Sequence, residues 1–135
     1  MIPTWIDLQI HGDERGSLVA IETGRQVPFT VRRVYYIFGT KPGVTRGLHA
    51  HRRLHQLCIP VAGSCRMTLD NGRNRTDVLL SDPHLGLAIG PSIWREMHDF
   101  SQDCVLLVLA DQEYDEADYI RNYQEFLTHA HSSFR

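Results

Sequence analysis

Two histidines separated by a single residue, His49 and His51, are the clearest candidates for chemistry in this sequence. In an extended strand alternate side chains share a face, so we expect both imidazoles to project together, with Gly47 beside them. Such a pair could be half of a metal site or an acid–base pair. Alternatively, one ring is a surface residue and the other a hydrogen-bonded core residue. The residues around the pair bear on this choice.

Length and composition predict one domain over residues 1–135, with 42% hydrophobic and 22% charged residues. The formal net charge of −2 gives no reason to expect nucleic acid or an anionic membrane as a partner. No apolar run reaches the ~20 residues that a membrane helix needs. No secretory signal is visible, and the three cysteines include no CxxC spacing. We therefore expect a cytoplasmic protein with reduced, mostly buried thiols.

Short segments rich in β-branched and aromatic residues, separated by Gly and Pro, predict an all-β sandwich or barrel. On the third segment Arg33, Tyr35 and Ile37 share one face. The Gly12-Asp13-Glu14 and Asp70-Asn71-Gly72 sequences predict turns. The expected strands cover residues 5–10, 15–22, 31–38, 46–51, 56–62, 65–69, 76–80, 86–89, 94–97 and 104–110.

The end of the chain differs from the rest. Ile120, Tyr123 and Leu127 recur at helical spacing, and Asp115 can cap a helix that runs from about residue 116 to 129. Phe134-Arg135 is expected to be a frayed tail.

The residues around the histidine pair resemble the first motif of the cupins, which are small β-barrels. Four residues stand at suitable places for that motif: Gly47, His49, His51 and Gly63. However, Gln56 stands where a Glu ligand would be, and Glu96 stands where the third His ligand of the second motif is expected. An amide is a poor ligand for zinc or iron, so the pattern disfavours a metal. A bulge that recruits His98 is the open alternative.

A longer series of motifs runs through the chain in one order: Asp13-Glu14-Arg15-Gly16, Pro28-Phe29, Arg33-Val34-Tyr35-Tyr36-Ile37, Arg46 to His51, Gln56, Asp70-Asn71-Gly72, Pro91-Ser92-Ile93-Trp94 and Tyr114 to Tyr123. Over almost the whole chain these motifs resemble the sugar 3,4-ketoisomerases that act on dTDP-4-keto-6-deoxyglucose. The resemblance implies a small cupin (jelly-roll) barrel with a C-terminal α-helix. It also implies an enzyme that works without metal or other cofactor and forms homodimers.

For this reaction the C3 proton must be removed, an enediol must form, and a proton must return at C4. Histidine suits this task because its ordinary pKa of about 6.5 is close to working pH. We expect His49 to take the C3 proton, and His51 to orient it or to move protons between the two oxygens. Tyr35 is the expected acid that feeds C4, unless it is a core aromatic. Arg33 shares its face and is expected to stabilise the enediolate.

The diphosphate of the substrate needs cations. Arg46, Arg121 and Lys41 are the candidates, although the last two are equally well explained as solvated surface charges. Trp94 could stack on thymine or fill the mouth of the barrel. The pair Arg15-Gly16 stands where family members differ, and it resembles members that give dTDP-3-keto-6-deoxygalactose.

The leading prediction is therefore a metal-free isomerase that supplies a deoxy- or amino-sugar precursor for a bacterial surface polysaccharide. Three alternatives stay open: a nucleotide-sugar 3,5-epimerase, a non-catalytic sugar-binding cupin and a metal-dependent cupin oxygenase.

Overall fold

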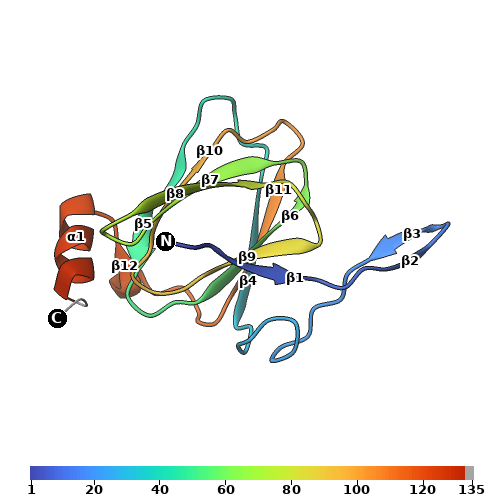
Figure 1. Cartoon of the computed structure of the whole chain (residues 1–135), viewed down its shortest axis with the longest axis horizontal. Helices are drawn as coiled ribbons and strands as arrows, with labels where there is room; N and C mark the ends of the chain where they lie inside the picture. The colour runs from blue at the N-terminus through green and yellow to red at the C-terminus, as the bar shows by residue number, and fades with distance from the viewer. Residues whose placement is uncertain (133–135) are drawn as a thin grey trace.

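The interior of the protein lies between two five-stranded antiparallel sheets, shown in Figure 1. The structure is a computed structural model that describes residues 1–132. In order across the first sheet, the strands are β1 (Thr4–Asp7), β9 (Leu85–Ile89), β6 (Gln56–Ala62), β11 (Val105–Ala110) and β4 (Arg33–Phe38). Across the second sheet they are β12 (Tyr119–Ile120), β5 (Arg46–His51), β10 (Trp94–His98), β7 (Cys65–Asp70) and β8 (Arg75–Leu80).

Apolar side chains from both sheets fill the space between them. Leu106 and Val108 of the first sheet pack in the same buried cluster as Met67 and Leu69 of the second. The alternation of side chains along each strand explains this arrangement, because every second residue faces inward. The predicted all-β cupin-type barrel is confirmed, and the strand expected over residues 56–62 matches β6 at both ends.

The N-terminal region departs from the prediction. The strand expected over residues 15–22 is wrong, because β2 (His11–Asp13) and β3 (Gly16–Leu18) form a separate hairpin that projects from the sheets (Figure 1). The turn falls at residues 14–15 rather than 12–14. The carboxylate of Asp13 accepts the backbone N–H of Arg15 at 2.8 Å, which is typical of such turns.

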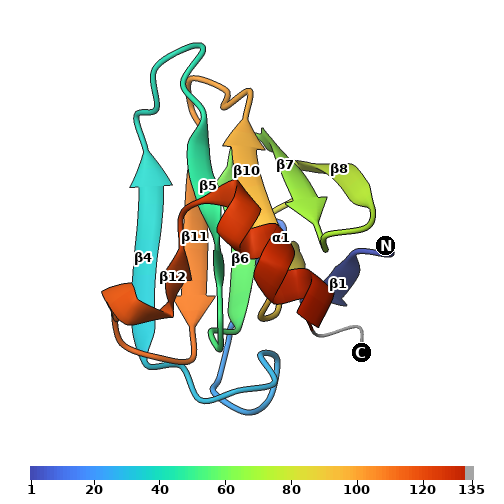
Figure 2. The same ribbon diagram turned by 90° about the vertical axis from the view of Figure 1, so that its left-hand side faces the viewer.

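The long C-terminal helix expected over residues 116–129 is also wrong. Asp115 does cap a helix, since its side chain accepts the N–H of Ala117, but this is the short 3-10 helix η1 (Glu116–Asp118). The chain then leaves the helical path as β12, which pairs with His51 and Ala50 of β5. The α-helix α1 (Tyr123–Ser132) follows and crosses the outside of the second sheet (Figure 2). The tail predicted at residues 134–135 lies outside the described residues.

Strand β5 carries the histidine pair and contains a bulge. His49 pairs with Arg95 and Gly47 with Glu96, so Leu48 is the extra residue. Gly47 and Leu48 both have positive φ values, of 83° and 58°. This conformation suits glycine but strains leucine. The bulge therefore interrupts the regular strand immediately before the first histidine.

The three cysteines are free and buried, as predicted. Burial raises the pKa of Cys58 to about 11 and that of Cys65 to about 12. These thiols stay protonated at neutral pH and are poor nucleophiles. No described helix is long and apolar enough to cross a membrane.

Candidate active site

An open cleft of about 700 Å³ lies between strand β4 of the first sheet and strand β5 of the second. Tyr35 and Arg33 reach it from β4, and His49 and Arg46 reach it from β5. Arg121 closes one side, directly after β12. In Figure 2, β4 and the segment that contains β12 lie on the same side of the molecule. The fold thus brings together five residues that the sequence singled out.

The two imidazoles lie side by side as expected. Their ring centroids are 4.9 Å apart, and the ring planes are nearly perpendicular. Nδ1 of His49 lies 3.0 Å from the backbone carbonyl of Gly47. A carbonyl oxygen only accepts, so Nδ1 carries the proton and Nε2 keeps its lone pair.

His51 is held in the same tautomer by a carboxylate. Its Nδ1 lies 3.1 Å from Oδ2 of Asp118, and both side chains are buried. Nε2 of His51 is buried and has no hydrogen-bond partner among the described residues. In both rings, therefore, Nδ1 carries the proton and Nε2 is unprotonated.

Both imidazoles are neutral at pH 7. Burial and the nearby guanidinium of Arg95 lower the pKa of His49 to about 4. The same two causes, burial first, lower the pKa of His51 still further. A neutral imidazole with a free lone pair can accept a proton from carbon, whereas an imidazolium cannot.

Tyr35 lines the cleft from β4, whereas His49 lines it from β5, and Tyr35 is a neutral donor. Its hydroxyl oxygen accepts a hydrogen bond from Nε2 of Gln56 at 2.9 Å. Burial raises the pKa of Tyr35 to about 12, so the phenol keeps its proton. The guanidinium of Arg33 lies 5.4 Å from the centre of the Tyr35 ring, and its buried Nε has no hydrogen-bond partner within residues 1–132.

Sequence reasoning missed three residues of this site. Arg95 is 1% exposed and lies close enough to both histidines to influence their pKa values. Asp118 holds His51, and Tyr119 packs on both imidazoles with centroid distances of 5.0 and 4.3 Å. The sequence offered one indication of these residues. Gln56 stands where the cupin motif has a Glu ligand, and an uncharged amide there indicates that its partner is a protein side chain rather than a metal.

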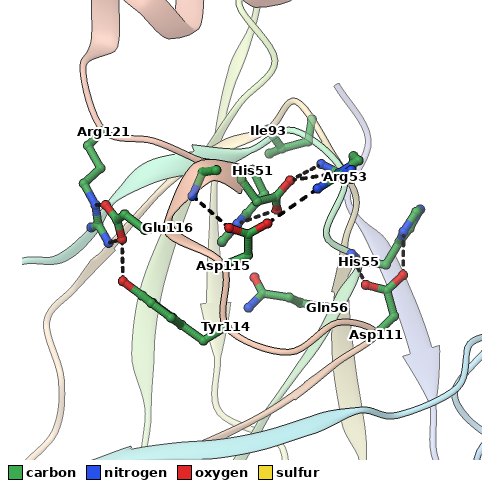
Figure 3. Close-up of polar contacts among 12 residues, drawn as sticks. His51, Arg53, His55, Gln56, Ile93, Asp111, Tyr114, Asp115, Glu116 and Arg121 are labelled. Carbon is green, nitrogen blue, oxygen red and sulfur yellow. Dashed lines mark hydrogen bonds and ion pairs between the residues drawn. The ribbon is translucent and has the colours of Figure 1, made fainter.

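The remaining predicted cations lie at different depths. Arg121 covers the ring of Tyr119 at 4.2 Å and is ion-paired with Glu116, which also accepts the hydroxyl of Tyr114 (Figure 3). Arg46 is exposed at the rim of the cleft. Lys41 is exposed on the loop between β4 and β5 and does not line the cleft.

Two predicted placements are corrected. Trp94 is 4% exposed and packs against Tyr123 and Phe126 of α1, so it is not available to stack on a base. His98 contacts Glu96 and Thr45 rather than the histidine pair, so a bulge does not recruit it there.

Arg15 and Gly16 lie on the exposed β2–β3 hairpin, outside the cleft of their own chain.

The donor set does not resemble a metal centre. Among residues 1–132 no three His, Cys, Asp or Glu side chains come together in a way that could hold a metal ion. Gln56 uses both ends of its amide, one toward Tyr35 and the other toward Arg95. The arrangement is suited to moving protons at carbon between neutral groups.

Comparison with known proteins agrees with this chemistry. Residues 1–131 match the family model FdtA, described as "WxcM-like, C-terminal". A TDP-4-oxo-6-deoxy-alpha-D-glucose-3,4-oxoisomerase from Aneurinibacillus thermoaerophilus is 54% identical over 114 residues, which are 84% of this chain and 82% of that protein.

Two solved structures are also similar. A variant of the 3,4-ketoisomerase QdtA from Thermoanaerobacterium thermosaccharolyticum, in complex with TDP-4-keto-6-deoxyglucose, is 42% identical with a TM-score of 0.96. That match covers 98% of this chain and 96% of the other. The WlaRB TDP-quinovose 3,4-ketoisomerase from Campylobacter jejuni is 48% identical, with a TM-score of 0.89 over 93% and 97% of the two chains. The chain therefore belongs to the WxcM-like family of nucleotide-sugar 3,4-ketoisomerases and is a nucleotide-sugar isomerase.

Proposed function

We propose that this enzyme moves the ketone of TDP-4-keto-6-deoxyglucose from C4 to C3. The observation that carries the proposal is that neutral His49, from β5, and protonated Tyr35, from β4, line the same cleft, with His51 buried against His49. Bases and acids of this kind are what an enediol mechanism needs, and each positioned group typically contributes ~10²–10⁴-fold in rate.

The reaction starts with removal of the C3 proton by Nε2 of His49. The electrons of that C–H bond form the C3–C4 double bond, and the carbonyl electrons move to O4. Tyr35 then delivers a proton to C4, while His51 moves the O3 proton toward O4. The ketone is now at C3. The proton held by His49 is released to solvent and Tyr35 is reprotonated from solvent, so both groups are restored and no redox cofactor is consumed. The guanidinium of Arg33, which lines the cleft beside Tyr35, stabilises the enediolate charge.

The arginines at the cleft suit the diphosphate of the substrate. Arg46 lies at the rim, and Arg121 lies beside Tyr119. A guanidinium binds phosphate oxygens through paired N–H donors, which fixes orientation as well as charge. We assign Arg46 the main contact, because Glu116 already engages Arg121.

A homodimer forms part of the proposal. Strand β4 is an edge of the first sheet, and its side chains Val34, Tyr36 and Phe38, which also border the cleft, are 55%, 61% and 68% exposed. An exposed apolar edge strand is a favourable surface for a second copy. Arg15 lies on the projecting hairpin, outside the cleft of its own chain, so a role for Arg15 in the reaction requires that the hairpin reach the cleft of a second copy.

The product proposed is TDP-3-keto-6-deoxygalactose, supported by the Arg15-Gly16 pair. Such a product is a precursor of deoxy and amino sugars for surface polysaccharide, made in the cytoplasm.

Incubation with TDP-4-keto-6-deoxyglucose in D₂O, followed by NMR of the product, tests the function. Migration of the ketone with an axial C4 hydroxyl is expected. An equatorial C4 hydroxyl contradicts the galacto product, and inversion at C5 indicates an epimerase. Binding without turnover indicates a sugar-binding cupin. Light scattering of the purified protein tests the dimer.

A further inference from the structure

We infer that Arg95 and Gln56 form a buried relay that sets the direction of the hydrogen bond at Tyr35, so that the phenol proton points into the cleft. Both are positioning residues that act through Tyr35. The inference deepens the proposed function, because it rests on the role of Tyr35 as the acid.

Arg95 is an unusual residue for the interior of a β-sandwich. It is 1% exposed, and its guanidinium donates to the carbonyl of Ile93 from Nε at 3.3 Å and from one terminal nitrogen at 3.0 Å. The other terminal nitrogen donates to Oε1 of Gln56. These partners are neutral, and arginine is seldom buried without a paired anion. Burial of a charged group away from water costs free energy, so a cation at this depth indicates a specific task.

The position of the cation fixes the polarity of the Gln56 amide. A guanidinium only donates, so the amide must present Oε1 to Arg95. The other end, Nε2, then faces Tyr35 at 2.9 Å. Gln56 is 3% exposed, so water does not compete for the amide. Rotation of the amide would bring N–H groups against N–H groups, and the arrangement is therefore locked.

The locked amide in turn fixes Tyr35. An NH₂ group only donates, so the phenol oxygen must be the acceptor in this contact. The single phenol proton remains available for another acceptor. Tyr35 lines the cleft, where the substrate lies in the proposed mechanism. Without the relay, a carbonyl or carboxylate at position 56 would accept the phenol proton and hold it inside the protein.

Gln56→Glu tests the relay with almost no change in volume. The carboxylate pairs with Arg95 and accepts the hydroxyl proton of Tyr35, which reverses that hydrogen bond. We expect kcat to fall by about 10²-fold, the lower end of the range for loss of one acid–base group, while KM changes less than about threefold. Gln124→Glu, on the exposed face of α1, is the control for the added charge and is expected to keep wild-type activity.

A double-mutant cycle with Tyr35→Phe separates the relay from a structural role. If Gln56 acts through Tyr35, then Gln56→Glu costs about twofold or less in the Tyr35→Phe background, because the group it controls is absent. An equal loss in both backgrounds overturns the relay. If Gln56→Glu does not fold, Gln56→Met answers the same question by removing the donor, with the same expected dependence on Tyr35.

NMR of ¹³C-labelled tyrosine provides a readout besides activity. Gln56→Met is expected to shift the Cζ resonance of Tyr35 at neutral pH, since the phenol oxygen loses the hydrogen bond from Gln56. If Tyr35→Phe abolishes turnover while Gln56→Glu leaves kcat unchanged, the relay is wrong and the acid role stands. If Tyr35→Phe keeps full activity, both the acid role and the relay are wrong.

Discussion

Nδ1 of His51 lies 3.1 Å from Oδ2 of Asp118, although the two residues are 67 positions apart in the chain. The other carboxylate oxygen of Asp118 accepts the backbone N–H of Arg53 at 2.9 Å. One carboxylate therefore fixes both the end of β5 and the tautomer of the histidine. The contact exists because the chain turns from η1 into β12 and runs beside β5.

Asp118→Asn should reverse the tautomer of His51. The oxygen of the asparagine can keep the N–H of Arg53, which places its NH₂ group against Nδ1 of His51. Nδ1 must then accept, so Nε2 carries the proton and loses its basic lone pair. We expect a loss in kcat of about 10²-fold or more. ¹⁵N NMR of the histidine ring checks the tautomer, and unchanged turnover with the new tautomer would exclude a role for Nε2 of His51.

His49→Asn should abolish exchange of the C3 proton with solvent while nucleotide binding persists. Asparagine retains some of the polarity and size of the imidazole but cannot act as a base at neutral pH. A loss of ~10²–10⁴-fold in the exchange rate is expected. Deuterium incorporation followed by NMR measures this rate, and calorimetry with TDP measures binding. Exchange near the wild-type rate would show that another residue is the base.

The dependence of activity on pH should be flat through neutrality. The pKa of His49 is lowered to about 4, so the base is fully active above roughly pH 5 and loses activity only as pH falls through about 4. The pKa of Tyr35, at about 12, keeps the acid protonated at pH 9. A profile of kcat/KM from pH 4 to 10 tests this. An inflection near pH 6.5 would contradict the lowered pKa.

The same lowered pKa values affect folding. The unfolded chain takes up protons on His49 and His51 below about pH 6.5, whereas the folded chain does not until a much lower pH. The unfolded state binds more protons in this window, so the free energy of unfolding should fall as pH drops from about 6.5 toward 4. Urea titrations at several pH values measure the effect, and His49→Asn should reduce the slope.

Gly63→Ala should destabilise the protein strongly. Gly63 has a φ of 62°, and an added Cβ would lie 2.3 Å from Oγ of Ser101 and 2.7 Å from Cα of Cys104. Strain of the backbone and overpacking together predict a loss of about 2–4 kcal/mol. Gly24→Ala is the matched control, since its φ is 73° but nothing lies within 4 Å of the new methyl group. Its expected cost is about 1 kcal/mol. Equal losses in the two variants would exclude the steric argument.

The central strands and the histidine pair were predictable because alternation along a strand decides which side chains share a face. The same rule placed Arg33 and Tyr35 together on β4, as the structure has them. Arg95 could not be found this way. An arginine in a strand is usually an exposed residue, and only the three-dimensional contact with Gln56 explains its burial.

The prediction of a long C-terminal helix was wrong for a different reason. Ile120, Tyr123 and Leu127 have helical spacing, yet Ile120 belongs to β12 and the other two belong to α1. Pairing of β12 with β5 and the packing of Tyr119 on the imidazoles outweigh local helical preference. Asp118 was therefore hidden inside a predicted helix.

Tyr35 and His49 belong to different sheets. Strand β4 is hydrogen bonded only to β11 among the described strands, and β5 only to β10 and β12. The span between proton donor and proton acceptor is thus set by the thickness of the apolar layer, where side chains such as Leu106 and Met67 meet. A substitution that thins this layer, such as a smaller side chain in the core, should therefore misalign the two groups. The activity of such a variant should decline at temperatures where the chain is still folded.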